Sequence, residues 1–388
     1  MDTKKAFSLI SSYGFFLFGF TSIILGSALP AIEKSFGLDH QMAGVLLSLP
    51  TLAFMASAIV VSSLSNRFGP FKLLAAGIVC IATGLTVLSV GRSFWLLLVG
   101  SMTVSFGTGS METSIGIAVS GLNYKKPGGA LNLMHSFFAI GSIISPLIVA
   151  AFLVDYTSWW KPFLIALFVS LLLLSFIPFL YGIPFVGSDE KATHFRKEIF
   201  SRKIFWLIMV GVLLYVGYEI GFTSWLSSFM FESKGIEMRY ASIFPALLWA
   251  GIFVGRLLAG FFVDKLGYEL SLLMMVIIAF VSFGAALLFQ SVFAIALAVV
   301  FAGFGFSGTF PTLQAILISS MKNGIGFAIG MFTVAASIGG AMSNFLVGLL
   351  GHHFGMMAGV IFILFLIFLE MVVVLLIMRV RKERLDAQ

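Results

Sequence analysis

Three acidic residues stand inside long apolar stretches of the sequence: Glu112, Glu219 and Glu370. An ionised carboxylate at the centre of a bilayer costs about 2.5–3.5 kcal/mol on insertion scales, so such a group is expected to be protonated for part of its working cycle. A carboxyl that gains and loses a proton is suited to moving protons across a membrane. The alternative is a permanently protonated Glu that only hydrogen-bonds to packed helices. We predict proton coupling first for Glu112 and second for Glu219, and a packing role for Glu370.

Polar and aromatic side chains lie in the same stretches as these acids. Amides, an imidazole and aromatic rings together suit a sugar-like solute, which stacks its C–H faces on rings and hydrogen-bonds through its hydroxyls. Each residue also has a structural alternative, because amides bridge membrane helices, histidines and tyrosines pack, and Trp anchors at the lipid interface. The predicted substrate contacts are Asn132, His135, Tyr218, Trp225 and Gln314.

The composition is that of a polytopic membrane protein. The 388 residues are 60% hydrophobic and only 10% charged, whereas soluble domains carry about 25% charged residues. The single Cys80 excludes an intramolecular disulfide bond. The sequence contains no pattern for a catalytic nucleophile with its base, for a phosphate-binding loop or for a metal site. We therefore expect neither an enzyme nor an ATP-driven pump, and no cofactor or metal.

Runs of eighteen or more mostly apolar residues predict membrane-spanning helices. Twelve such runs occur, and the first is too long for the apolar core of a cleaved signal peptide. The predicted spans lie near 8–32, 41–64, 73–91, 94–121, 129–154, 159–182, 204–231, 240–263, 270–289, 292–318, 324–350 and 355–378.

The basic residues are distributed unequally between the loops on the two sides. With the N-terminus inside, seventeen of the 23 Lys and Arg fall on the inner side and five on the outer side; Arg256 is set aside as lying near a helix end. The positive-inside rule then predicts that both termini are cytoplasmic, in the cell membrane. The net charge of +7 is explained by this topology and by anionic lipid, so no nucleic-acid partner is expected.

The two halves of the chain repeat each other at an offset near 198 positions. Asn66-Arg67-x-Gly69 after the second span matches Asp264-Lys265-x-Gly267 after the eighth, and Ala139-Ile140-Gly141 matches Ser337-Ile338-Gly339. The sequence therefore predicts two six-helix repeats. The predicted domains are a bundle over 1–186, a cytoplasmic linker over 187–203, a second bundle over 204–378 and a basic tail over 379–388.

The chain resembles the major facilitator superfamily over nearly its whole length. In that family a Gly-x-x-x-Asp-Arg-x-Gly loop follows the second span and latches the two halves on the cytoplasmic side. The resemblance implies an all-α fold of twelve helices in two pseudo-symmetric bundles, alternating access, and a solute cavity lined by the first, fourth, seventh and tenth spans. The first copy departs from the motif, with Ser62 in place of the first Gly and Asn66 in place of Asp. The residues at the latch-motif positions are Asn66, Arg67, Gly69, Gly260, Asp264, Lys265 and Gly267.

Within that superfamily the chain is most similar to the fucose–proton symporters and their glucose/mannose relatives. "MET" at 111–113, "ALNLMHSFFAIGSIISP" at 130–146 and "YVGYEIGFTSW" at 215–225 resemble motifs of their fourth, fifth and seventh spans. The resemblance implies a proton and substrate role for Glu112. Fucose symporters also carry an acid in the first span, which this chain lacks, so fucose itself is not expected.

We therefore predict a monomeric secondary transporter that moves a small polar solute together with protons, with sodium as the other coupling ion considered. The main alternative is a proton-driven exporter of drugs or metabolites. The residues before and after Pro146 do not match the Gly-Pro-x-x-x-Gly motif of such antiporters, which lowers this alternative without excluding it. A membrane sensor with a transporter fold is a further alternative.

Overall fold

A computed structural model describes residues 3–121, 127–180, 199–321 and 324–386. Within these ranges nothing is described of the side chains of residues 3–5, 120–121, 127–132, 180, 259–262, 264 and 383–386. Of the predicted linker over 187–203, the structure describes only residues 199–203. Helix α9 begins at Lys203.

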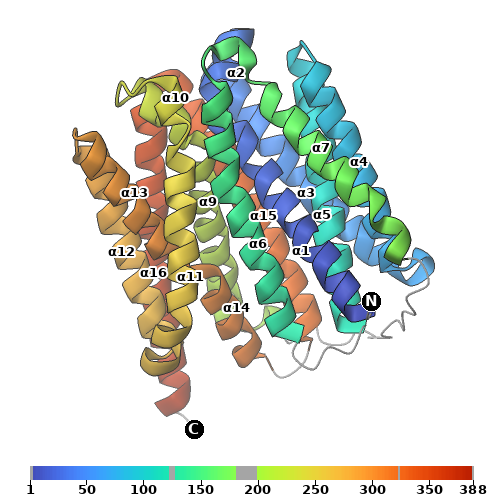
Figure 1. Ribbon diagram of the computed structural model, residues 1–388. Helices are drawn as coiled ribbons and strands as arrows, with labels where there is room; N and C mark the ends of the chain where they lie inside the picture. The colour runs from blue at the N-terminus through green and yellow to red at the C-terminus, as the bar shows by residue number, and fades with distance from the viewer. Residues whose placement is uncertain (1–2, 122–126, 181–198, 322–323, 387–388) are drawn as a thin grey trace.

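The first half of the chain forms long helices that run side by side (Figure 1). Its elements are α1 (Thr3–Ser27), α2 (Leu29–Phe36), α3 (His40–Phe68), α4 (Pro70–Val90), α5 (Phe94–Gly121), α6 (Pro127–Phe152), η1 (Tyr156–Ser158), α7 (Lys161–Ser175) and η2 (Ile177–Leu180).

The second half repeats this arrangement beside the first. Its elements are α9 (Lys203–Glu232), α10 (Met238–Ala241), α11 (Phe244–Leu266), α12 (Tyr268–Leu288), α13 (Val292–Phe306), α14 (Thr309–Ser320), α15 (Ile325–Phe354) and α16 (Met356–Asp386). Helix α16 continues through most of the segment that the sequence analysis assigned to a basic tail.

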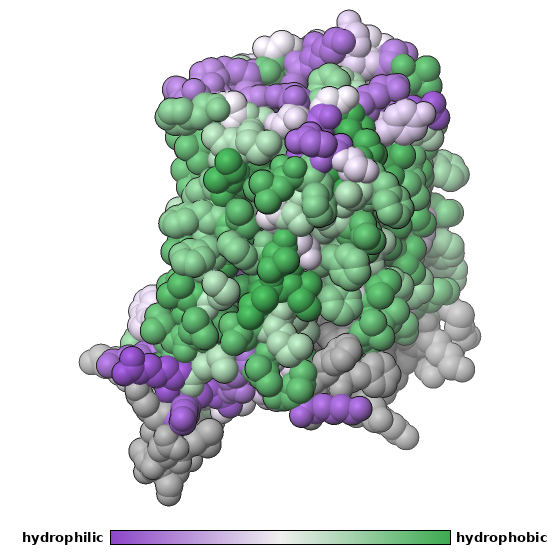
Figure 2. All heavy atoms as spheres, turned by 90° about the vertical axis from the view of Figure 1, so that its left-hand side faces the viewer, coloured by the Kyte–Doolittle hydropathy of each residue, from purple (hydrophilic) through white to green (hydrophobic). Residues whose placement is uncertain are grey.

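Twelve spans in the described residues are long and apolar enough to cross a membrane, which agrees with the sequence prediction. Figure 2 shows the matching surface, a broad apolar band between two polar ends. We call the two polar ends the termini end and the α2 end. Helices α1 and α16 have their free ends at the termini end, and the short helices α2 and α10 lie at the opposite, α2 end (Figure 1).

The tenth span, predicted near 292–318, is present as Val292–Ser320 but is built from two helices. Helix α13 ends at Phe306 and α14 begins at Thr309, with Ser307 and Gly308 between them. Pro311 lies in the first turn of α14 and has no N–H to bond the preceding turn. The break therefore leaves carbonyl groups at the end of α13 without helical partners.

Each half has a close helix crossing at equivalent positions of the repeat. In α6, a Cβ on Gly141 would overlap the backbone carbonyl of Phe16 in α1, and in α15 a Cβ on Gly339 would overlap that of Leu213 in α9. Only glycine lets two helix backbones approach this closely, as small residues do in many membrane bundles.

The two halves meet mainly along three pairs of long helices: α1 with α9, α3 with α15, and α6 with α11. At the α2 end the short helices add two smaller contacts, α2 with α9 and α10 with α6. The buried apolar side chains form two clusters, one mainly from residues 7–177 and the other mainly from residues 199–377. Polar side chains on the six meeting helices therefore lie where a movement of one half against the other would change their surroundings.

Candidate functional site

A polar site within the membrane-spanning region is built around Glu219 in α9. The Tyr215 hydroxyl, one helical turn earlier, lies 2.7 Å from Glu219 Oε1, because residues four apart share one face of a helix. The guanidinium of Arg256 in α11 lies 3.9 Å from the same oxygen. The Glu219 side chain is 10% exposed and that of Arg256 31% exposed, so the charged pair is partly open to its surroundings rather than sealed.

The break in the tenth span supplies a second acceptor to this site. The Tyr215 hydroxyl lies 2.9 Å from the Phe306 carbonyl oxygen, at the last residue of α13. A tyrosine hydroxyl has one proton to donate and two lone pairs that accept. Tyr215 can therefore donate to Glu219 or to Phe306, and in the second case it can accept a hydrogen bond from a protonated Glu219.

Arg256 also connects the site to the other half of the molecule. Its guanidinium lies 5.9 Å from the centre of the Trp249 ring in α11, a cation–π distance. It also acts electrostatically on His135 in α6. The sequence analysis missed Arg256 because it treated the residue as part of a helix end. The available signal was its position inside the predicted span 240–263, where a cation calls for a partner.

Aromatic rings continue from this site into the first half. Trp249 packs edge-on against Phe138 in α6 at 5.2 Å between ring centroids, and Phe138 packs against Phe18 in α1 at 4.8 Å. His135, one turn before Phe138, packs on Phe15 at 4.7 Å. The structure thus places the predicted residue His135 on α6, which packs against α11, the helix that carries Arg256.

Glu112 lies in α5, a helix that contributes no residue to the arrangement of Tyr215, Glu219 and Arg256. In the described part of the chain its carboxylate has no hydrogen-bond or ion-pair partner, and the residue is only partly buried. A carboxylate without a fixed partner can accept a proton or a solute hydroxyl. Glu112 and Glu219 are therefore separate acids, one without a described partner and one held between Tyr215 and Arg256.

Glu370 in α16 is completely buried, and its two carboxylate oxygens lack a hydrogen-bond partner in the described residues. It lies close to Tyr218, whose hydroxyl faces the Glu370 carboxyl and Thr309 without forming a well-aligned hydrogen bond. A buried carboxyl in such surroundings is expected to be neutral. The packing role of Glu370 stays a prediction, because the hydrogen bond that it calls for is not formed in this conformation.

The other predicted substrate contacts do not gather at one point. Tyr218 and Trp225 are fully buried, and Trp225 donates through Nε1 to the Asn344 carbonyl at 3.3 Å. Gln314 is partly exposed on α14. Asn132 belongs to α6, but its side chain lies outside the described residues.

The two predicted latch loops have the same backbone form. Gly69 between α3 and α4 has φ of 76°, and Gly267 between α11 and α12 has φ of 80°, a conformation that glycine adopts without strain. Asn66, Arg67 and Lys265 are exposed. The surroundings of Gly260 and the side chain of Asp264 are outside the described part of the structure.

A third group of ionisable residues, which the sequence analysis did not single out, lies at the α2 end. Glu33, His40 and Glu232 place one ligand atom each within 4.8 Å of one another. Both ring nitrogens of His40 already contact carboxylate oxygens, at 2.9 Å from Glu33 and 3.0 Å from Glu232. These residues are separated by up to 199 positions in the sequence, so no local motif could reveal the group.

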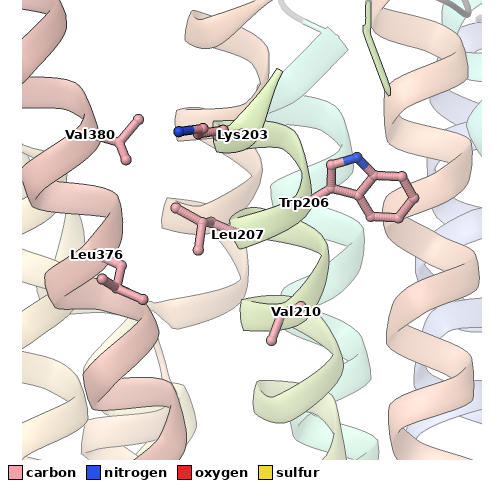
Figure 3. Close-up of a pocket in the computed structure, with 6 residues that line it drawn as sticks. All are labelled: Lys203, Trp206, Leu207, Val210, Leu376 and Val380. Carbon is pink, nitrogen blue, oxygen red and sulfur yellow. The ribbon is translucent and has the colours of Figure 1, made fainter. Parts of the chain in front are cut away.

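A groove of about 360 Å³ lies between α9 and α16, on the apolar outer surface (Figure 3). It is lined by Lys203, Trp206, Leu207, Val210, Leu376 and Val380. Several of these apolar side chains are among the exposed ones, including Trp206 and Val210. Because this groove offers a solute almost no polar partner, it is better suited to lipid than to a sugar.

Curated relatives with low identity include two sugar carriers. The glucose/mannose transporter GlcP of Bacillus subtilis is 23% identical over 251 residues, with 61% of each chain covered. The putative glucose/galactose transporter of Helicobacter pylori is 24% identical, with 61% of this chain and 63% of the relative covered. The chain covers between 33% and 61% of the length of the first three curated relatives it matches.

Solved structures with the same fold cover nearly the entire chain. A bacterial homologue of the human lysosomal transporter Spinster, in an inward-facing and unoccupied conformation, superposes with a TM-score of 0.84 at 15% identity, covering 97% of this chain and 96% of that one. A D-xylose–proton symporter superposes with a TM-score of 0.69 at 17% identity, covering 94% and 97%. At these identities the likeness establishes the fold alone.

The family model described as Major Facilitator Superfamily matches residues 12–344, which is most of the chain. The match agrees with the twelve spans, the repeat and the fold of the solved structures. The chain is therefore a multi-pass membrane protein, and it belongs to the major facilitator superfamily.

Proposed function

We propose that this protein moves a small polar solute of sugar type across the cell membrane together with protons, by alternating access. The observation that carries the proposal is the site of Tyr215, Glu219 and Arg256, which can accommodate Glu219 both with and without a proton. A coupling residue must be stable in both states, because it takes up the proton on one side and gives it up on the other.

In the ionised state Glu219 has two partners that favour its charge. Tyr215 donates a hydrogen bond to it at 2.7 Å, and Arg256 lies 3.9 Å away. A hydrogen bond to a charged acceptor is worth about 1.5–3 kcal/mol, which is similar to the cost of the charge at membrane depth. The two partners therefore offset much of that cost.

In the protonated state the same atoms form a different chain of hydrogen bonds. The Glu219 hydroxyl donates to the Tyr215 oxygen, and Tyr215 donates to the Phe306 carbonyl oxygen at 2.9 Å. No polar hydrogen in this chain loses its acceptor. The attraction between Glu219 and Arg256 is lost at the same time, which frees the guanidinium to interact with Trp249, His135 or a bound solute.

Protonation of Glu219 can thus act on the contact between the two halves. Arg256 lies on α11, and His135 and Phe138 lie on α6, which packs against α11. A change in the position of the guanidinium alters the Trp249–Phe138 contact and the field at His135. Differential stabilisation of this kind at the contact between halves is what a coupled rocking motion needs.

Two features support a sugar as the solute. Trp249 lies beneath the Arg256 guanidinium and packs on Phe138, which packs on Phe18. A sugar offers apolar faces to such rings and hydroxyls to the polar groups beside them. Two distant relatives carry names that specify hexose transport. His135, Asn132 and Gln314 remain the proposed contacts with solute hydroxyls. Tyr218 and Trp225 are fully buried and would need the other conformation to take part.

Glu112 is proposed as the second proton or substrate residue. It lies on the fourth span, in α5, with no described partner, so a solute hydroxyl or a proton can bind it without breaking an existing contact. Glu219, with its two hydrogen-bonding states, has the more complete surroundings for coupling.

The test is uptake of labelled hexoses into proteoliposomes that contain the purified protein, with and without an inward proton gradient. The proposal predicts accumulation above the external concentration only with the gradient. It also predicts that Glu112→Gln reduces accumulation, while Glu269→Gln at the surface pair with Arg381 leaves it unchanged. Export of a lipophilic cation with no hexose uptake would instead support the exporter alternative.

A small organic anion is a second candidate solute, because Arg256 presents a partly exposed cation beside His135. A relative described as a probable sulfoacetate transporter in Cupriavidus necator is 25% identical over 251 residues. The same assay with a labelled small carboxylate or sulfonate decides between the two, because the transported solute is the one that accumulates. If both solutes bind at Arg256, each should reduce uptake of the other.

A further inference from the structure

A histidine at the α2 end joins the two halves of the protein through carboxylates on either side of its ring. His40, the first residue of α3, has Nδ1 2.9 Å from Glu33 Oε1 in α2 and Nε2 3.0 Å from Glu232 Oε2, the last residue of α9. Glu33 and His40 belong to the first half and Glu232 to the second. Ser228 in α9 adds another link, as its hydroxyl donates to Glu33 Oε2 at 3.0 Å.

The surroundings of this cluster are closely packed. The Glu33 side chain is only 9% exposed, whereas those of His40 and Glu232 are 21% and 32% exposed. The His40 ring lies edge-on to Trp225 of α9, with 6.0 Å between ring centroids. In α15, a Cβ on Gly348 would overlap the His40 carbonyl oxygen. Because little water reaches Glu33, its contacts are stronger than those of an exposed ion pair.

The two short nitrogen–oxygen contacts of His40 need one proton more than a neutral imidazole and two ionised carboxylates carry. Each contact needs one hydrogen, and a neutral imidazole carries only one. The second hydrogen must lie either on the imidazole or on one of the carboxyls. Burial raises the pKa of the Glu33 carboxyl, against the lowering effect of His40 and Ser228. Closure of the α2 end is therefore tied to one extra proton held within the cluster.

The described ionisable residues next to the cluster have partners of their own and do not bond to His40. Among the described residues, Asp39 precedes His40 and lies 3.8 Å from His352 of α15 at the more exposed rim. Lys34 follows Glu33, but its ammonium lies over the Tyr156 ring at 4.6 Å. The cluster thus faces Asp39 and His352 on its outer side and Ser228 and Trp225 on its inner side.

We propose that Glu33, His40 and Glu232 form the outer gate of the transporter, and that the proton they share holds this gate closed. While the proton is bound, His40 ties α2 and α3 to α9. When the proton leaves, at least one link is lost and two carboxylates face each other, so the halves separate at the α2 end. This end is extracellular in the topology that the basic residues predict.

The experiment measures the separation of the halves directly. Spin labels are placed at Ser93 and Ser291, two exposed loop residues at the α2 end, one in each half, on a Cys80→Ser background. Double electron–electron resonance in lipid nanodiscs at neutral pH then gives the distribution of distances for the parent protein and for His40→Gln. His353→Gln serves as the control, because His353 lies exposed at the same end of α15 with no described partner in the other half.

For the parent and the control we expect one dominant short distance. For His40→Gln we expect the ratio of long to short distances to rise by roughly tenfold, the size of a typical coupling between two states. Glu232→Gln should act in the same direction, and all variants must elute as a single monodisperse species. Unchanged distances in both folded variants would overturn the proposal. This readout needs no solute and no gradient, so its outcome is independent of whether hexoses are the substrate.

Discussion

At the scale of single residues, the proposed coupling site depends on one hydroxyl with two acceptors. Tyr215 lies within hydrogen-bonding distance of both Glu219 and the Phe306 carbonyl, so a proton can be added to Glu219 without leaving a donor unsatisfied. Few side chains can serve both protonation states of Glu219, because the partner must donate a hydrogen bond in one state and accept it in the other. Arg256 provides the charge that distinguishes the two states. Each of these three side chains therefore has a role that can be tested separately.

Replacing Tyr215 by Phe removes the hydroxyl and keeps the ring that packs on Tyr218 and Phe310. Glu219 then loses its donor when ionised and its acceptor when protonated. We expect gradient-driven accumulation to fall by about tenfold, corresponding to the loss of one charged hydrogen bond. Tyr240→Phe, on an exposed side chain, is the control. Equal accumulation by Tyr215→Phe and the parent would show that the hydroxyl has no part in coupling.

Replacing Arg256 tests the charge itself. Arg256→Gln should abolish accumulation, since protonation of Glu219 would no longer change an ion pair, while Arg256→Lys should retain part of it because the positive charge remains. Uptake into proteoliposomes measures both, with Arg239→Gln near the α2 end as the control. Full accumulation by Arg256→Gln would remove Arg256 from the mechanism.

At the scale of helices, the site is held in place by two close crossings and one break. The crossings at Gly141 and Gly339 bring α6 against α1 and α15 against α9. The break between α13 and α14 exposes the Phe306 carbonyl to Tyr215. Glycines and Pro311 thus serve two purposes: they permit tight packing, and they release a backbone acceptor where the site needs one.

Adding a methyl group at a crossing should be costly. In Gly141→Ala and Gly339→Ala the new Cβ would overlap a backbone carbonyl, which cannot rotate away as a side chain can. We expect each variant to be destabilised by at least about 1–3 kcal/mol, the usual cost of overpacking. Thermal melting followed by size-exclusion chromatography checks this. Gly116→Ala, where no atom lies within 4 Å of the new Cβ, should melt like the parent.

Much of this architecture could be predicted from the sequence. Hydropathy alone located the twelve spans because lipid imposes a minimum apolar length. The offset of 198 positions paired Gly141 with Gly339 before their contacts were known. The position of the break in the tenth span could not be predicted, since an apolar run marks a span without showing where the backbone within it is interrupted.

The sites were less predictable than the spans, for a physical reason. Glu112 and Glu219 were found because a lone acid in an apolar run is unusual. Arg256 lay inside a predicted span and was missed because it was counted as part of a helix end. Glu33, His40 and Glu232 could not be associated at all, since only the folded arrangement brings α2, α3 and α9 together.

At the scale of the whole molecule, the two halves are joined at the α2 end by charged groups and deeper in the membrane by aromatic rings, with Trp249 of the second half packed on Phe138 of the first. Glu33 is buried while the α2 end is closed, and burial raises the pKa of its carboxyl above the ordinary 4.5. Opening exposes the carboxyl to water and removes this effect. The closed state therefore binds the proton more tightly than the open state.

The sign of the pH dependence follows from this difference. Proton binding stabilises the closed α2 end fully at low pH, and the stabilisation is lost as pH rises through the raised pKa of the cluster. We expect the Ser93–Ser291 distance to lengthen as pH rises in the parent. In Glu33→Gln, which cannot titrate at this position, the change should be smaller. A distance that shortens with rising pH would contradict the assignment.

The most direct test of the central claim is a comparison of two transport modes in Glu219→Gln. The amide resembles a protonated carboxyl and cannot release a proton. The account predicts that Glu219→Gln still exchanges labelled hexose across proteoliposomes at equilibrium, at a rate near that of the parent, but does not accumulate it under an inward proton gradient. Accumulation by Glu219→Gln to the level of the parent would show that the proton is carried elsewhere and would contradict the proposed coupling site.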